Sequence, residues 1–169
     1  MKMIGFFNQE NVSDDEAKQL QHKRSTRGIV FDTDNNIALL FTQDKGYYSI
    51  PGGGANDDET YEQAIIRECK EETGCDVEII KYIGTTLEYR KNKNILSEAW
   101  GYILKLVGEK GPLVLAGDED ESEKSTIVLW VPVSEAISLI ESVPNPPELY
   151  LQNCLNRDLT FLKAVDVNK

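Results

Sequence analysis

The chain has 169 residues, of which 40% are hydrophobic and 28% are charged, a composition typical of one globular domain with a full core. Its formal net charge of −11 at pH 7 argues against sequence-independent binding of nucleic acid, which requires a basic surface. We expect no membrane span, because no stretch approaches the roughly 18 uninterrupted apolar residues that a span needs. We expect no secretory signal, because the N-terminus turns acidic without a long apolar stretch. The expected protein is cytoplasmic, without nucleic-acid or membrane partners.

The cysteines and the histidine exclude several kinds of site. Cys69, Cys75 and Cys154 are odd in number and lack C-x-x-C spacing, so we expect reduced thiols that pack as small apolar side chains. His22 is the only histidine, and we expect it at the surface. This scarcity argues against a zinc site and against Ser-His-Asp or Cys-His catalysis.

The N-terminal part of the chain predicts a polar segment followed by strands. Residues 1–26 are expected to be peripheral to a single domain at 27–169, with a short helix from the capping-box pattern Ser13–Glu16 to about Gln21. Next come predicted strands at 27–32 and 35–43, a turn at 33–36 between them, and a short strand within 47–54 that ends at a proline and three glycines.

A helix is strongly predicted from Tyr61 to Thr73. Thr60 and Gln63 have capping-box spacing, and Gly74 stands where a C-terminal glycine cap belongs.

The C-terminal half alternates strand and helix patterns. Strands are predicted at 75–91, 95–109 and 125–133, with an exposed acidic loop at 116–124. A helix capped by Ser134 follows at 134–143, and a last helix at about 148–163 is expected to pack through Leu151, Leu155, Leu159 and Leu162. The elements predict a sheet with helices on its faces, of the α/β or α+β class.

The helix at 61–73 carries carboxylates where they are unfavourable. Glu68 and Glu72 fall on the same stripe as Ile65 and Cys69, four residues apart and near the C-terminal end, where like charges repel and the helix dipole disfavours anions. Arg67 can offset part of this cost by pairing with a neighbouring glutamate, and a hard divalent cation would remove it.

The turn at 51–54 can add backbone groups to a metal or phosphate site formed by these carboxylates. Its exposed carbonyls can complete a metal shell, and its amides can meet phosphate oxygens. The alternative, from the residues alone, is a glycine-rich turn beside an acidic surface helix.

These residues resemble the signature of the Nudix family, in which glycine, glutamate and arginine positions recur at fixed spacing. The matching positions are Gly53, Glu59, Arg67, Glu68, Glu71, Glu72 and Gly74. Cys69 and Cys75 depart from the signature, because they stand where aliphatic residues are usual. The resemblance implies an α/β/α sandwich around a mixed β-sheet.

The resemblance also implies an activity, the hydrolysis of a nucleoside diphosphate linked to another group, with Mg²⁺ or Mn²⁺ as cofactor. Carried over by position, Glu68 and Glu72 are the main metal ligands, helped by Glu71 and by a carbonyl of Gly52 or Gly53. The pair Glu59 and Arg67 would orient the loop and the helix. The glutamate at position 68 is the general base in some members, whereas in others the base lies on a later loop.

Residues outside the signature are weaker candidates. Tyr48, Tyr89 and Arg90 are substrate-binding candidates, since tyrosines can stack on a base and Arg90 heads a small basic cluster with Lys91 and Lys93. Glu88, Glu98 and the run 118–123 are candidates for a later acid, and Glu98 also counts as a substrate contact. The alternative interpretation of Glu98 is an outward strand position, and that of the run 118–123 is a solvated loop.

Three functions compete at this stage. The first is a pyrophosphohydrolase acting on a nucleoside triphosphate, ADP-ribose, a dinucleoside polyphosphate or a nucleotide sugar. The second is a non-catalytic Nudix-like sensor of such nucleotides, and the third is an isoprenoid-diphosphate isomerase-like enzyme, for which Cys154 is poorly placed. A homodimer is left open.

Overall fold

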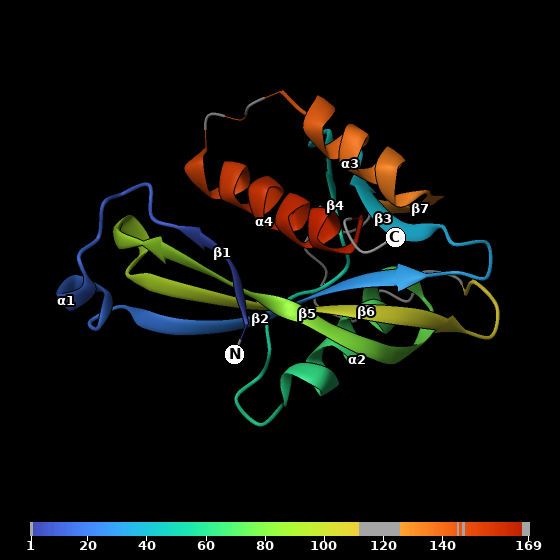
Figure 1. Cartoon of the computed structure of the whole chain (residues 1–169), viewed down its shortest axis with the longest axis horizontal. Coiled ribbons are helices and arrows are strands. Elements are labelled where there is room, and N and C mark those ends of the chain that lie inside the picture. Colours follow the sequence, from blue (N-terminus) through green and yellow to red (C-terminus); the bar gives the residue numbers. More distant parts are fainter. Residues whose placement is uncertain (1, 112–125, 145, 147, 167–169) are drawn as a thin grey trace.

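A mixed β-sheet forms the centre of the computed structural model, which describes residues 2–111, 126–144, 146 and 148–166. Helices cover both faces of this sheet (Figure 1), so the predicted α/β sandwich is confirmed. The acidic loop predicted at 116–124, including the run 118–123, lies outside the described residues.

Seven strands of the described chain make up the sheet, in the order β1-β5-β6-β2-β3-β4, with β7 paired to β3. The pairs β1–β5 and β2–β6 are parallel, whereas the remaining pairs are antiparallel. The strands are β1 (Met3–Phe7), β2 (Gln21–Phe31), β3 (Ile37–Thr42), β4 (Tyr47–Ser49), β5 (Asp76–Arg90), β6 (Ile95–Val107) and β7 (Thr126–Val131).

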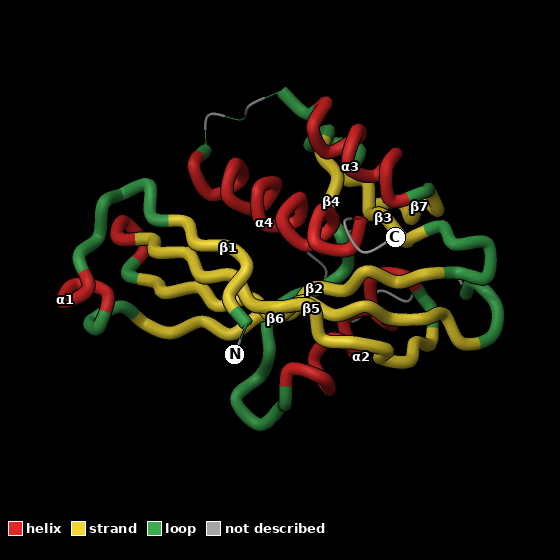
Figure 2. The backbone as a smooth tube through the Cα atoms, in the orientation of Figure 1, coloured by secondary structure: helices red, strands yellow, loops and turns green. Residues whose placement is uncertain are grey.

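The helices divide between the two faces of the sheet, as the tube view shows (Figure 2). On one face, α2 packs Ile65 and Cys69 in a buried cluster with Val30 and Leu104. On the other face, α4 packs its apolar side chains against Ile29. The helical segments are α1 (Asp14–Ala17), α2 (Tyr61–Thr73), the short 3-10 turn Lys91–Lys93, α3 (Val133–Ser142) and α4 (Leu149–Asp166).

The N-terminal segment contributes more structure than its polarity predicts. β1 pairs with β5 at the edge of the sheet, and β2 runs through the domain boundary predicted at residue 26. The predicted helix is shorter than expected and ends at Ala17, because Gln21 already pairs with Ile95 in β6. Main-chain hydrogen bonds to a long neighbouring strand support this pairing without an apolar side-chain pattern.

Two details of the C-terminal helices also differ from the prediction. Helix α3 begins at Val133, and the residue before it is Pro132, so Ser134 is not the cap. The Pro132 carbonyl accepts the hydrogen bond of the Ala136 amide, which starts the helix one residue earlier. Helix α4 extends past Lys163. Of the four leucines predicted to pack, Leu155 and Leu162 belong to the core cluster and Leu159 packs against it, whereas Leu151 does neither.

The glycine turn is held against the edge of β2. Strands β2 and β3 pair only at Phe31 and Ile37, which leaves the N-terminal half of β2 with one free edge. There the Gly28 amide donates to the Pro51 carbonyl (2.8 Å), and the Thr26 amide donates to the Gly53 carbonyl (2.9 Å). The turn therefore lies between β2 and α2.

No helix in the described part of the chain is long and apolar enough to cross a lipid bilayer.

All three cysteines are free, and Cys69 and Cys75 are buried as expected for small apolar side chains.

We predict that Gly101→Ala weakens the fold by displacing α4 from the sheet. A Cβ at Gly101 would collide with the ring of Phe161, which is fully buried. The free energy of unfolding in a denaturant titration should fall by about 1–3 kcal/mol, as for an overpacked core. Gly54→Ala is the control, because its Cβ would meet open space. Equal stability of the two variants would contradict the prediction.

Candidate active site

Helix α2 is fixed at both ends by its own sequence. The Thr60 hydroxyl accepts a hydrogen bond from the Gln63 amide (3.1 Å), and the Gln63 side chain accepts one from the Thr60 amide (2.9 Å). Gly74 closes the helix in the left-handed conformation, with φ 70°. Both predicted caps are therefore confirmed, and they set which side chains of α2 face the glycine turn.

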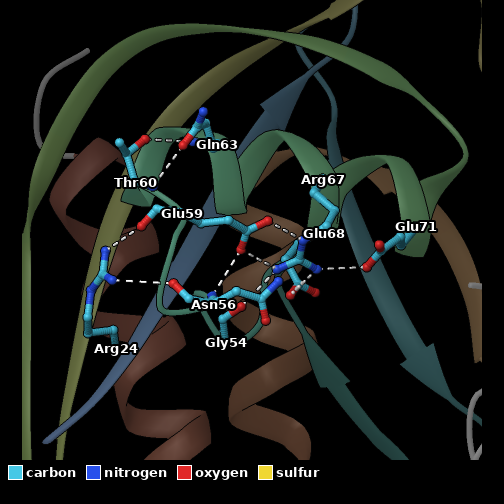
Figure 3. A network of polar contacts seen from close by, with 9 residues as sticks. All are labelled: Arg24, Gly54, Asn56, Glu59, Thr60, Gln63, Arg67, Glu68 and Glu71. Carbon is cyan, nitrogen blue, oxygen red and sulfur yellow. Dashed lines mark hydrogen bonds and ion pairs between the residues drawn. The ribbon is translucent and has the colours of Figure 1, made fainter.

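Arg67 joins the loop before α2 to the helix itself (Figure 3). Its guanidinium donates to both carboxylate oxygens of Glu59 (2.8 and 3.0 Å) and to the Gly54 carbonyl (2.9 Å). Nη1 of the same group also donates to Glu68 (2.8 Å) and to Glu71 (2.9 Å). Arg67 therefore pairs with Glu59 in the loop and with Glu68 and Glu71 on the helix at the same time.

Glu59 is the best compensated carboxylate of this network. The Arg67 hydrogen bonds, followed by the Asn56 amide at 2.9 Å, lower the pKa of Glu59 to about 2. Arg24 holds the same loop from the other side, because its Nη2 donates to the Glu59 carbonyl oxygen (2.8 Å). Glu59 is therefore a fixed anion that anchors Arg67.

Glu68 and Glu72 face the glycine turn. The Gly52 amide donates to the Glu72 carboxylate (2.6 Å), and a Cβ at Gly53 would collide with the carboxylate of Glu68. Gly52 has φ 137°, and a Cβ there would collide with the Thr26 carbonyl. The two carboxylates thus lie against backbone that has no room for a side chain, which explains the glycines physically.

The protein environment disfavours charge on both of these glutamates. Burial raises the pKa of Glu72 to about 8, against the opposing effects of the Gly52 amide and of Arg27. Burial also raises the pKa of Glu68, although Arg67 opposes this shift. The side chain of Glu68 is only 13% exposed. The neighbouring arginines therefore do not fully stabilise the charged forms of these two carboxylates.

These residues are not a preassembled metal centre. Within the described ranges of the chain, no three His, Cys, Asp or Glu side chains converge as a metal site. Glu68 and Glu71 instead share Arg67, and Glu72 is held by the Gly52 amide. The donor set still fits a hard divalent cation, since such ions prefer carboxylate and carbonyl oxygens and stabilise crowded anions. A cation there would compete with Arg67 for Glu68 and Glu71.

Sequence reasoning missed a buried ionic cluster behind the glycine turn. Arg27 of β2 lies 3.7 Å from Asp158 of α4, and Arg157 donates to the same carboxylate at 2.8 Å. Asp158 also accepts the Ile50 amide (3.2 Å) just before the turn. Two guanidinium groups thus share one carboxylate, and Arg27 is near enough to Glu72 to lower its pKa. The signal in the sequence that could have indicated this cluster is the presence of charged residues within otherwise apolar strand and helix patterns.

The predicted residues outside the signature have other partners. Tyr48 stacks on Phe41, with ring centroids 4.6 Å apart, and Tyr89 packs edge-on against Phe6 at 5.0 Å. Glu98 bonds to the exposed His22 (2.6 Å) and to the Trp100 indole. Arg90 pairs with Glu88 and lies over the Tyr150 ring. None of these contacts involves the α2 carboxylates, so substrate binding by these residues stays a prediction.

Comparison with known proteins finds relatives over most of the chain. A family model described as NUDIX domain matches residues 21–152. A MutT-like protein of Streptomyces ambofaciens is 31% identical over 114 residues, which cover 68% of this chain and 66% of that protein. An ADP-ribose pyrophosphatase of Methanocaldococcus jannaschii is 30% identical over 97 residues, which cover 56% of each. The chain thus spans less than two thirds of the length of either curated relative.

A solved structure shares the fold more completely. The NUDIX hydrolase from Nitrosomonas europaea superposes with a TM-score of 0.65, covering 88% of this chain and 91% of that one. The identity is 14%, so this likeness supports the fold alone.

We predict that the metal-free protein loses stability as pH rises, relative to Glu72→Gln. The folded-state pKa of Glu72 is about 8, against an ordinary value of 4.5. The folded state therefore binds the proton more tightly, and this contribution, complete below the ordinary pKa, is lost as pH rises through the folded value. In denaturant titrations in EDTA from pH 5 to 9, the free energy of unfolding of Glu72→Gln should therefore rise relative to that of the parent protein as pH rises.

The exposed Glu78→Gln is the matched control and should show no such gain. A difference between Glu72→Gln and the parent that stays constant over this pH range would contradict the prediction.

Proposed function

The chain belongs to the NUDIX family, and we propose on this premise that it is a metal-dependent pyrophosphohydrolase. The bond cleaved is the pyrophosphate linkage of a nucleoside diphosphate joined to another group. Water attacks one phosphorus atom, and the second phosphate leaves with the rest of the substrate.

One observation carries this proposal. Glu68 and Glu72 lie on adjacent turns of α2, both turned towards the Gly52–Gly53 backbone, and burial raises the pKa of each. A fold does not gain stability by placing two poorly compensated carboxylates together, so the pair is best explained by a cation that binds there in function.

The proposed ligands of Mg²⁺ or Mn²⁺ are Glu68 and Glu72, with Glu71 and a carbonyl of Gly52 or Gly53 as further donors. When bound, the ion would supply positive charge opposite the phosphate oxygens and would acidify the attacking water. Arg67 holds Glu68 and Glu71 at 2.8 and 2.9 Å. Its role in the proposal is to keep the carboxylates in place until the cation binds.

Other residues of the chain would act on the substrate directly. Arg27 and Arg157 share Asp158, so this buried cluster has one positive charge more than it has negative charge. An anionic phosphate group beside Arg27 would balance that excess. The attacking water must also give up a proton, and a carboxylate with a raised pKa such as Glu68 suits that role.

The relatives do not fix the substrate. One is named only as a MutT-like protein, and another as an ADP-ribose pyrophosphatase. A panel of nucleoside triphosphates, ADP-ribose, dinucleoside polyphosphates and nucleotide sugars, each with Mg²⁺ or Mn²⁺, tests the class directly. Binding of such nucleotides without turnover would instead favour the non-catalytic sensor.

We predict that Glu72→Gln abolishes hydrolysis of the best substrate of the panel. The amide removes a negative donor, and kcat should fall by at least about 100-fold, as for loss of an essential metal ligand. Product release measured by chromatography, with and without EDTA, gives the rate. The parent protein should lose its activity in EDTA and recover it when Mg²⁺ or Mn²⁺ is added.

The control variant is Glu78→Gln, which makes the same change at an exposed position of β5. It should retain the activity of the parent. Turnover by Glu72→Gln at the parent rate would remove the metal assignment, and turnover in EDTA would remove the metal dependence.

A further inference from the structure

Asp158 of α4 joins three parts of the fold that surround the proposed metal site. Its carboxylate accepts a hydrogen bond from Arg157 Nε (2.8 Å) and another from the Ile50 amide (3.2 Å). The same carboxylate lies 3.7 Å from Arg27 Nε of β2, and the Asp158 side chain is only 1% exposed. A charge at that depth is stable only among cations and amides, so these three groups fix its position.

Asp158 reaches the glycine turn from the side opposite to α2. Helices α4 and α2 lie on different faces of the sheet (Figure 2). Ile50 immediately precedes the turn at 51–54, in which the Gly52 amide donates to Glu72 at 2.6 Å. The segment is therefore bonded to α4 through Asp158 and to α2 through Glu72.

Arg27 lies between these two carboxylates. A Cβ at Gly52 would come within 2.9 Å of the Arg27 Cα, so Arg27 is next to the residue that holds Glu72. Burial, followed by the charge of Arg157, lowers the pKa of Arg27, whereas Asp158 and Glu72 both oppose this shift. The described residues show an ion pair of Arg27 with Asp158 and none with Glu72.

Two buried guanidinium groups compete for the Asp158 carboxylate. Arg157 holds it at hydrogen-bond distance, whereas Arg27 is further away, and the three residues together carry one uncompensated positive charge. A buried cation with an incomplete partner gains from a second carboxylate. Glu72 is the other carboxylate that stabilises the charge of Arg27. Without the charge of Asp158, we therefore expect Arg27 to turn to Glu72.

A pairing of Arg27 with Glu72 would oppose metal binding. The guanidinium would occupy the carboxylate oxygens that a hard divalent cation needs, and it would place a positive charge beside that cation. In the present arrangement the Glu72 carboxylate is held by the small Gly52 amide. The pairing of Arg27 with Asp158 thus leaves Glu72 available.

We propose that Asp158 is a positioning residue for the metal site, because it keeps the Arg27 guanidinium on the α4 side and leaves the Glu72 carboxylate open to a divalent cation. The inference rests on the proposed function for the assignment of Glu72 as a metal ligand. It gives α4, which lies outside the signature motif, a role in the site. The same restraint holds Arg27 where the proposed function requires it for a phosphate group.

The test is the binding of Mn²⁺ to the full chain without substrate, measured by electron paramagnetic resonance of the free ion. Asp158→Asn keeps an oxygen for the Ile50 amide and removes the negative charge. Its dissociation constant for Mn²⁺ should rise by about 10-fold or more, as when a residue that orients a metal ligand is changed. Unchanged binding of Mn²⁺ by a folded Asp158→Asn would overturn the proposal.

Two double variants separate the position of Arg27 from the net charge of the cluster. Arg27→Gln/Asp158→Asn and Arg157→Gln/Asp158→Asn both restore the net charge of the parent cluster. The first should recover most of the parent affinity for Mn²⁺, whereas the second should bind as weakly as Asp158→Asn. Equal recovery in both would indicate an effect of charge alone, and recovery in neither would indicate a displaced turn. Either result would overturn the proposal.

Because the cluster is buried, the folding of each variant is checked by circular dichroism and a denaturant titration. If Asp158→Asn does not fold, Arg157→Gln tests the same restraint, since it leaves the Asp158 carboxylate to Arg27 alone. This variant should bind Mn²⁺ at least as tightly as the parent protein does. Weaker binding by a folded Arg157→Gln would contradict the role given to Asp158.

The two proposals fail in different ways. If Glu72→Gln binds Mn²⁺ as tightly as the parent protein, the metal assignment of the proposed function is wrong, and the role of Asp158 falls with it. If Glu72→Gln loses Mn²⁺ binding but Asp158→Asn keeps it, only the role of Asp158 is wrong.

Discussion

The arrangement of the site depends on one guanidinium group. Arg67 donates to Glu59 and the Gly54 carbonyl in the loop and to Glu68 and Glu71 on the helix, so it fixes loop and helix relative to each other. A planar group with five N–H donors can satisfy these acceptors together, whereas a lysine ammonium has three donors and no fork geometry. Without Arg67, Glu68 and Glu71 would lose the cation that they share, and the loop would lose one of the two arginines that hold it.

The glycine turn meets two different steric limits in consecutive residues. At Gly52 the limit is the Thr26 carbonyl of the strand edge, and at Gly53 it is the Glu68 carboxylate. The turn is therefore confined between the sheet and the helix, with its main chain bonded to β2 and to Glu72. Backbone that is held in this way can present its carbonyls to a cation without further ordering, which lowers the entropic cost of binding.

The predictable parts of the molecule are those encoded locally. Helix α2, with its caps at Thr60 and Gly74, follows from a short run of sequence, and so does the inward direction of Glu68 and Glu72. The start of β2 and the strand β1 were missed, because their polar side chains carry no strand pattern and their stability comes from distant partners. The cluster of Arg27 and Asp158 was missed for the same reason, since its members meet only through the packing of α4 on the sheet.

Local charge, and not the net charge of −11, decides how such a protein receives an anion. Arg27 and Arg157 share the single carboxylate of Asp158, so an excess of buried positive charge lies close enough to Glu72 to lower its pKa. A substrate with anionic phosphate groups and a bound cation carries the matching charges, because its phosphates suit the arginines and its cation suits the carboxylates. Placing the phosphates directly against the α2 carboxylates would instead bring like charges together and leave the buried arginines uncompensated, so the local charges favour a single orientation of the substrate.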